Sequence, residues 1–208
     1  MTNTEQGSEG GRREQLQSRI KNILFTPAQE WDRIDAEPAT DKGLFLGYAC
    51  ILAAIGPIAG LIGGQLFGRQ GFYLTVHPPL IQSIVSALVD YGLSLVGVYV
   101  LALAIDLMAP SFGGTRSPIQ ALKVAVYAWT ASWLFQIFQL VPPVSALSII
   151  GVYSLYLMYL GIPKLMKAPA DKAAVYSVIT IVVALAIWIV VALVAGALIA
   201  TSAGVAAI

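Results

Sequence analysis

The sequence predicts an all-α fold: a polytopic membrane bundle of five transmembrane helices with a duplicated helical hairpin. Three observations support this. Of the 208 residues, 58% are hydrophobic and only 11% are charged, with a mean hydropathy of +0.79, whereas roughly a quarter of a soluble domain is charged. Five apolar stretches are each long enough to provide the ~20 residues that cross a bilayer. The Lys and Arg residues gather almost entirely on one side of these stretches.

The polar N-terminal region divides into two parts. Residues 1–11 are rich in Gly, Ser, Glu and Thr, a composition that predicts a disordered tail. Residues 12–43 form a cytoplasmic amphipathic segment, because apolar residues recur in it at helical spacing. Within it, Thr26-Pro27 marks the start of a second, shorter helix, since Thr is a favoured cap and Pro is favoured in the first turn.

Trp31 and Ile34 share one face of this second helix. Two alternatives stay open for the amphipathic segment: its helices lie on the membrane surface, or they pack against the protein's own loops. Four acidic residues argue against a strong role in binding anionic headgroups, namely Glu30, Asp32, Asp35 and Glu37.

The membrane domain is expected over residues 44–208. Its five spans are predicted at about 44–64, 80–107, 119–140, 144–166 and 173–201. Each apolar run is too long for a barrel strand and lacks two-residue alternation. A helix is therefore the conformation that satisfies the backbone hydrogen bonds in lipid.

The charge distribution predicts the orientation. Of the twelve Lys and Arg residues, only Arg69 falls in a loop on the far side of the first span. The others precede the first span or lie in the links after the second and fourth spans: Arg12, Arg13, Arg19, Lys21, Arg33, Lys42, Arg116, Lys123, Lys164, Lys167 and Lys172. By the positive-inside rule, the N-terminus is cytoplasmic and the C-terminus lies outside.

The second and fourth spans echo each other, with Ser94-Leu-Val-Gly-Val-Tyr matching Ser148-Ile-Ile-Gly-Val-Tyr. The spans that follow them also share a pattern that begins at Lys123 and at Lys172. Such a repeat predicts a duplicated hairpin with pseudo-symmetry about the membrane normal. Chance similarity between apolar sequences is the alternative.

Two spans carry small residues at four-residue spacing, which allows close helix approach. The first span has Gly56, Gly60 and Gly64, and the fifth has Ala192, Gly196 and Ala200. Packing within the bundle is the first interpretation, and a homo-oligomer interface is the second.

Asp90 is the most informative residue of the membrane domain. It lies ~10 residues into the second span, which places it ~15 Å deep at 1.5 Å per residue. A charge there costs on the order of 2.5–3.5 kcal/mol on insertion scales. We therefore predict an intramembrane polar site, which consists of Asp90, Ser86, Ser94, Thr130, Tyr153 and Tyr156. Its carboxyl either ties helices together or handles protons or ions.

A second candidate site is a cytoplasmic interface near the ends of the spans. It consists of Trp31, Asp106, Arg116, Lys123, Lys164 and Lys172. Asp106 is within reach of Arg116 or Lys123, so we expect an interfacial ion pair. The Gly113-Gly114 loop lacks the Lys of a phosphate-binding loop and a preceding strand, which argues against nucleotide binding.

The sequence offers little for catalysis. His77 and Cys50 are the only residues of their types, and neither a nucleophile–base pair nor paired intramembrane carboxylates are evident. We expect no enzyme activity, no cofactor and no metal site. Basic residues interleaved with aromatics are also missing, which argues against nucleic acid as a partner.

Three motifs together resemble the bacterial branch of the Yip (Ypt-interacting protein) family. They are ILFTPAQEWDRI from Ile23, LMAPSFGG from Leu107 and GVYSLYLMYLGIP from Gly151. The resemblance covers about residues 18–195 and implies five helices, a cytoplasmic N-terminus and, for this branch, the bacterial inner membrane. Eukaryotic relatives bind prenylated small GTPases, but this chain lacks their long N-terminal domain and its Leu-Tyr-Gly-Pro segment.

Two functions follow as hypotheses. The first is a non-enzymatic membrane scaffold or interaction protein of the Yip-family type, which contacts membrane lipids or an unknown protein partner through its cytoplasmic face. The second is a small transporter or channel that uses Asp90.

Overall fold

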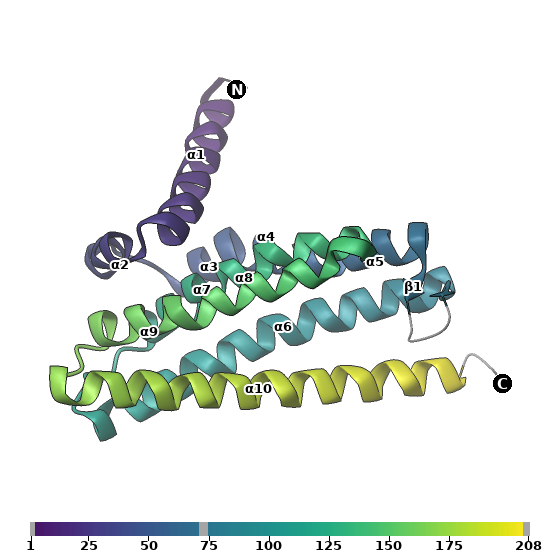
Figure 1. The fold of residues 1–208 in the computed structure, drawn as a ribbon. Helices are drawn as coiled ribbons and strands as arrows, with labels where there is room; N and C mark the ends of the chain where they lie inside the picture. The colour runs from purple at the N-terminus through teal and green to yellow at the C-terminus, as the bar shows by residue number, and fades with distance from the viewer. Residues whose placement is uncertain (1–2, 71–74, 206–208) are drawn as a thin grey trace.

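A computed structural model describes residues 3–70 and 75–205 of the protein. Within them the chain forms an elongated, almost entirely helical bundle whose long helices run side by side (Figure 1). The first helix leads away from this bundle, and the last runs along its length (Figure 1). The predicted all-α class is confirmed.

The N-terminal region contains α1 (Asn3–Phe25) and α2 (Pro27–Ala36). We expected a disordered tail over residues 1–11, but the structure continues α1 back to Asn3; residues 1 and 2 lie outside the described part. Once a helix is nucleated, each further residue adds a hydrogen bond, and this can extend α1 toward the N-terminus. Thr26 precedes α2 as expected, yet its hydroxyl donates to the carbonyl of Asn22 (3.1 Å) instead of capping α2.

The first membrane segment is built from four consecutive helices. They are α3 (Asp41–Leu44), the π-helix η1 (Phe45–Ala49), α4 (Cys50–Ala53) and α5 (Ile55–Phe67). Pro57 has no N–H to donate to the carbonyl of Ala53, and α4 ends at that residue. Beyond α5, the short strands β1 (Arg69–Gln70) and β2 (Thr75–Val76) pair antiparallel.

The second and third segments differ sharply in regularity. α6 (Leu80–Met108) is unbroken and leads into the 3-10 helix η2 (Ala109–Phe112). The predicted span 119–140 is instead divided into α7 (Pro118–Ala128), α8 (Thr130–Phe135) and the 3-10 helix η3 (Gln136–Leu140).

The last two segments are η4 with α9, and α10. The 3-10 helix η4 (Pro142–Val152) continues into α9 (Tyr153–Leu165), and α10 (Ala170–Val205) is the longest helix of the described chain. The two hairpins of the predicted duplication therefore contain different helices. One pairs an intact α6 with a divided segment, and the other pairs a half-3-10 segment with an intact α10.

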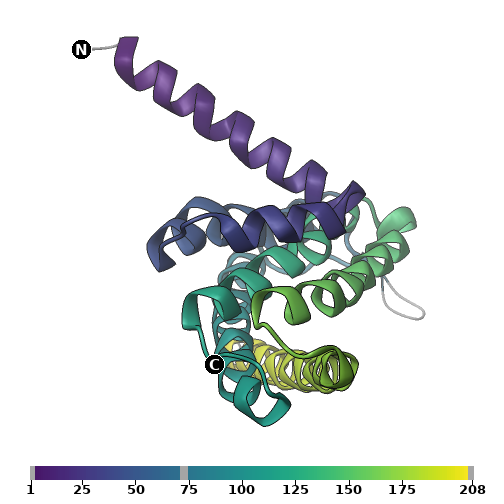
Figure 2. The same ribbon diagram turned by 90° about the vertical axis from the view of Figure 1, so that its left-hand side faces the viewer.

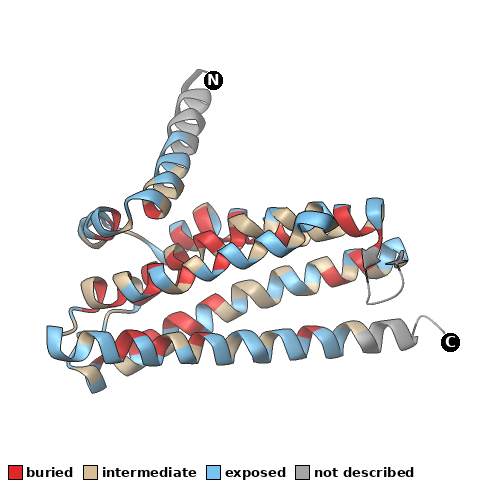
Figure 3. Ribbon diagram, in the orientation of Figure 1, coloured by how far each residue is buried: buried red, intermediate tan, exposed pale blue. Residues whose placement is uncertain are grey.

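Four helical stretches of the described residues are long and apolar enough to cross a membrane: Asp41–Phe67, Leu80–Phe112, Pro142–Leu165 and Ala170–Ile199. Most of α10 is exposed (Figure 3), and its exposed residues include Val182, Ile189 and Leu193. A large exposed apolar surface of this kind is typical of a contact with a membrane or with another protein. The pieces of residues 118–140 are individually too short to count, so this criterion yields four stretches where we predicted five spans.

The buried core is concentrated where α2 lies across the ends of the long helices (Figure 2). Fully buried large side chains there include Trp31, Ile105, Leu157 and Tyr176. A second close contact joins α5 to η3. A Cβ atom added to Gly63 would lie 2.5 Å from the carbonyl oxygen of Gln139, and one added to Gly56 would lie 1.7 Å from the Oε1 atom of Gln136. Gly56, one of the three small residues predicted at four-residue spacing, thus packs within the bundle.

Candidate functional site

The end of the bundle that carries α2 is held together by a set of contacts that we call the α2 cap. It comprises Arg19 with α2 and the residues of α7 and α9 that bind them. Its centre is Trp31, whose ring is fully buried against Gly161 of α9. A Cβ atom at Gly161 would lie 2.7 Å from that ring, so the indole fits only because residue 161 has no side chain.

Two lysines bind the backbone of α2. The Nζ of Lys123 donates to the carbonyls of Ile34 (2.8 Å) and Glu37 (2.6 Å), which lie at the C-terminal end of α2. The last carbonyls of a helix have no partners within it and carry its negative dipole end. Lys123 therefore caps α2 from a different helix, although only 4% of the residue is exposed. Lys164 similarly donates to the carbonyl of Ala28 (2.5 Å).

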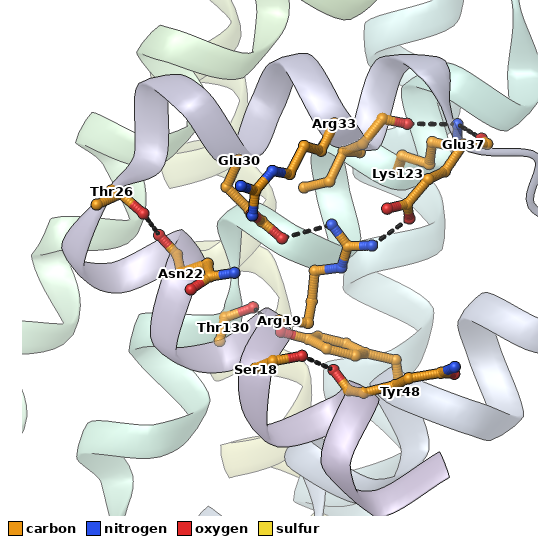
Figure 4. A network of polar contacts seen from close by, with 12 residues as sticks. Ser18, Arg19, Asn22, Thr26, Glu30, Arg33, Glu37, Tyr48, Lys123 and Thr130 are labelled. Atoms are coloured by element: carbon orange, nitrogen blue, oxygen red, sulfur yellow. Dashed lines mark hydrogen bonds and ion pairs between the residues drawn. The ribbon is translucent and has the colours of Figure 1, made fainter. Parts of the chain in front are cut away.

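Arg19 joins α1 to the cap (Figure 4). Its guanidinium pairs with Glu30 (2.5 Å) and with Glu37, and it lies over the ring of Tyr127 at 5.4 Å. The side chain of Glu30 is only 3% exposed. A buried carboxylate is stable only when it is paired, and Glu30 has two such partners, because Arg33 also lies 3.3 Å from it.

The other two loops at this end are joined directly. The N–H of Thr115 donates to the carbonyl of Met166 (2.8 Å), and a Cβ atom at Gly114 would lie 2.7 Å from the same oxygen. Asp106 is buried and pairs with Arg116 at 2.9 Å, one of the two partners that its position offered. The Gly-rich loop is thus a close packing contact between the two links.

A second candidate site is the Asp90 cavity, a space of about 320 Å³ between α5, α6, η3 and α10. Its polar lining residues are Ser83, Asp90, Ser94, Gln136 and Gln139. Trp129 and Trp188 also line it, and the remaining walls are Gly, Pro and aliphatic side chains.

The structure separates the residues of the predicted intramembrane polar site. Of the six, only Asp90 and Ser94 line the cavity. Ser86 donates to the carbonyl of Gln82, Thr130 bonds the hydroxyl of Tyr48 (2.8 Å), and Tyr153 donates to the carbonyl of Leu24 (3.0 Å). Tyr156 is 49% exposed. Equal depth in the membrane does not bring side chains together when their helices face different neighbours.

Sequence reasoning missed Gln136 and Gln139, which line the cavity from η3. Both glutamines lie within the expected third span, where uncharged amides are also rare, and that signal was available. Of the predicted cytoplasmic interface, Trp31, Lys123 and Lys164 lie in the α2 cap. The other three lie at the same end: the Asp106–Arg116 pair, and Lys172, which is exposed.

A comparison with models of protein families shows to which family the chain belongs. The family model described as the Yip1 domain matches residues 21–205, which is most of the sequence. The chain belongs to the Yip1 domain family. The curated proteins and the solved structures gave no match.

The Yip1 domain match begins within α1 and covers α2 and all the membrane segments. The three motifs that resemble the family meet at the α2 end of this Yip1 domain. Trp31 of the first motif packs on Gly161 of the third, Tyr153 of the third bonds Leu24 of the first, and Gly114 of the second contacts Met166 just beyond the third. These motifs therefore encode how α2 and the loops dock.

Proposed function

We propose that the protein is a non-enzymatic scaffold or interaction protein of the bacterial inner membrane, without a cofactor, which contacts lipid or a protein partner through its α2 end. Membership of the Yip1 domain family and the long apolar helices support a membrane protein. Five spans, a cytoplasmic N-terminus and the duplicated hairpin belong to the same proposal, and the sequence patterns are their support.

The observation that carries the proposal is the way the α2 cap uses its charges. Lys123 and Lys164 donate hydrogen bonds to the backbone of α2, and Arg19 pairs with Glu30 and Glu37. These contacts hold a preformed surface in place. Five further basic residues at this end are exposed: Arg33, Lys42, Arg116, Lys167 and Lys172. Three of these exposed basic residues, which we call the basic rim, also form ion pairs, Arg33 with Glu30, Arg116 with Asp106 and Lys167 with Asp35. A rigid surface with a charged rim suits binding, since little ordering entropy is lost on association.

The fifth span is proposed for residues 118–140. Although its helix is divided at Trp129, consecutive helical pieces cover the whole stretch. A broken helix is tolerated at membrane depth when neighbouring protein surrounds it. α7 and α8 fulfil that condition, because most of their residues are buried.

Reporter fusions test the orientation. We expect fusions at Ile208 and within residues 68–77 both to report the outer side, because eleven of the twelve basic residues lie on the other side of the membrane. A fusion at residue 114 serves as the inner-side control. An inner-side signal from either of the first two fusions would contradict five spans with a cytoplasmic N-terminus.

Site-specific photocrosslinking in cells tests the interaction role. A photoreactive residue at Arg33, Arg116 or Lys172 should yield the same discrete adducts from all three positions, protein or lipid, because these exposed residues lie at the end of the bundle that carries α2. The control position is Leu193, which is exposed on α10 and should give lipid alone. If none of these positions gave an adduct that Leu193 does not give, the result would contradict the interaction role.

The Asp90 cavity favours a second candidate function, a small transporter or channel. A carboxyl that lines an intramembrane cavity is a recurrent element of ion and proton pathways. In proteoliposomes, proton or ion flux that Asp90→Asn removes without unfolding the protein would favour this candidate over the scaffold.

A further inference from the structure

The Asp90 cavity combines a size and a lining that suit a small ligand. Its volume of about 320 Å³ lies at the lower end of the range for ligand pockets. Aliphatic residues of three elements make up much of the wall, among them Leu61, Leu93 and Val191. A hydrocarbon body would therefore find apolar surface there.

Two carboxamides enter this space from η3. The Oε1 atom of Gln136 lies against Gly56, where an added Cβ would approach it to 1.7 Å, and the Oε1 atom of Gln139 lies 3.2 Å from the Cβ position of Gly60. The glycines of α5 thus leave notches that receive these side chains. Within the part of the chain that the structure describes, neither carboxamide makes a hydrogen bond to another residue.

A polar side chain next to lipid is more stable when it is hydrogen-bonded. The serines of the cavity already have partners: Ser94 accepts from the indole N–H of Trp133 (3.1 Å), and Ser83 accepts from Gln65 (2.8 Å). The side chains of Gln136 (half-buried) and Gln139 (exposed) have no such partner among the described residues, so their amide groups are available to a ligand with polar atoms.

The negative charge of the lining favours a ligand with a positive charge. Among the described residues that line the cavity, Asp90 is the one with a formal charge. Trp129 and Trp188 line the same space, and the indole ring is the aromatic group that attracts cations most strongly. A bare metal ion is a poorer fit, because the described residues contain no group of three His, Cys, Asp or Glu side chains that could hold one.

We propose that the Asp90 cavity binds an amphiphilic organic cation, an ammonium group on a hydrocarbon body. The ammonium pairs with the carboxylate of Asp90 and donates to the amide oxygens of Gln136 and Gln139. The hydrocarbon lies along the aliphatic wall between α6 and α10. This binding goes beyond the proposed scaffold role and holds whether or not the ligand is transported.

The test is binding of octylammonium to the protein in lipid nanodiscs, measured by equilibrium dialysis with empty nanodiscs subtracted. Octan-1-ol, an uncharged compound of the same chain length, is the matched ligand. We expect octylammonium to bind at least ~10-fold more tightly than octanol, since a tenfold ratio corresponds to ~1.4 kcal/mol.

Variants locate the site. Asp90→Asn should reduce octylammonium binding ~10-fold or more and leave octanol binding unchanged. Asp171→Asn, on the exposed first turn of α10, should bind both ligands like the unmodified protein. If Asp90→Asn does not fold, Gln136→Leu provides the second variant and should weaken octylammonium binding selectively.

Two results would overturn the proposal. Equal binding of octylammonium and octanol would mean that the cavity holds hydrocarbon alone, such as a lipid chain. Octylammonium binding that survives both Asp90→Asn and Gln136→Leu would place the ligand elsewhere on the protein.

Discussion

Replacing Trp31 with Ala should detach α2 from α9 and lower the free energy of unfolding by about 3–5 kcal/mol, the usual cost of truncating a buried Trp. The indole is fully buried and fills the space that Gly161 leaves open. Its loss creates a cavity at the centre of the α2 cap. The lysine contacts to the backbone of α2 would then hold a helix without its anchor.

Thermal unfolding in detergent measures the loss, and amide exchange over residues 27–37 shows whether α2 detaches. Phe25→Ala is the matched control, because that aromatic side chain lies in the same region but is 77% exposed. We expect the control to change stability little. Equal protection of α2 in Trp31→Ala and the unmodified protein would show that the indole does not anchor the cap.

Substituting Gly63 with Ala should separate α5 from η3 and cost about 1–3 kcal/mol, as overpacking usually does. The added Cβ would meet the backbone oxygens of Gln139 (2.5 Å) and Leu140 (2.7 Å). Backbone atoms cannot turn aside as the end of a side chain can, so one element must shift. Because η3 carries Gln139, the Asp90 cavity should change shape as well.

The control for this prediction is Gly92→Ala in α6, where an added Cβ has no neighbour within 4 Å. Thermal unfolding should show that the two substitutions change the stability differently. Gly63→Ala loses stability, whereas Gly92→Ala stays neutral or gains up to ~1 kcal/mol through helix propensity. A Gly63→Ala protein as stable as the unmodified one would mean that α5 and η3 do not pack as closely as described.

The amphipathic segment shows how far pattern reasoning reaches. Helical spacing and Thr26-Pro27 correctly separated α1 from α2, and the shared face of Trp31 and Ile34 is the buried one. The pattern left open whether that face met lipid or protein, because both are apolar surfaces. Gly161, more than 100 residues away, answers the question for α2 by leaving room for the indole.

The intramembrane site shows the opposite case. Depth along each span placed Thr130 and Tyr153 near Asp90, but depth fixes only one coordinate of a side chain. The direction in which a helix faces depends on its neighbours. Residues 118–140 are divided at Trp129 into three helical pieces, and the last of them, η3, supplies Gln136 and Gln139 to the cavity. A periodic pattern read from an unbroken helix could not anticipate that turn.

The sequence by itself determined that this is a helical membrane protein and to which family it belongs. Those properties follow from composition and local pattern, since a long apolar run in lipid can satisfy its backbone only as a helix. Only the tertiary structure showed which charged side chains bind α2 and which polar groups line the Asp90 cavity. Such contacts join residues far apart in the chain, and in a membrane they depend on close packing of small residues, which leaves little trace in hydropathy.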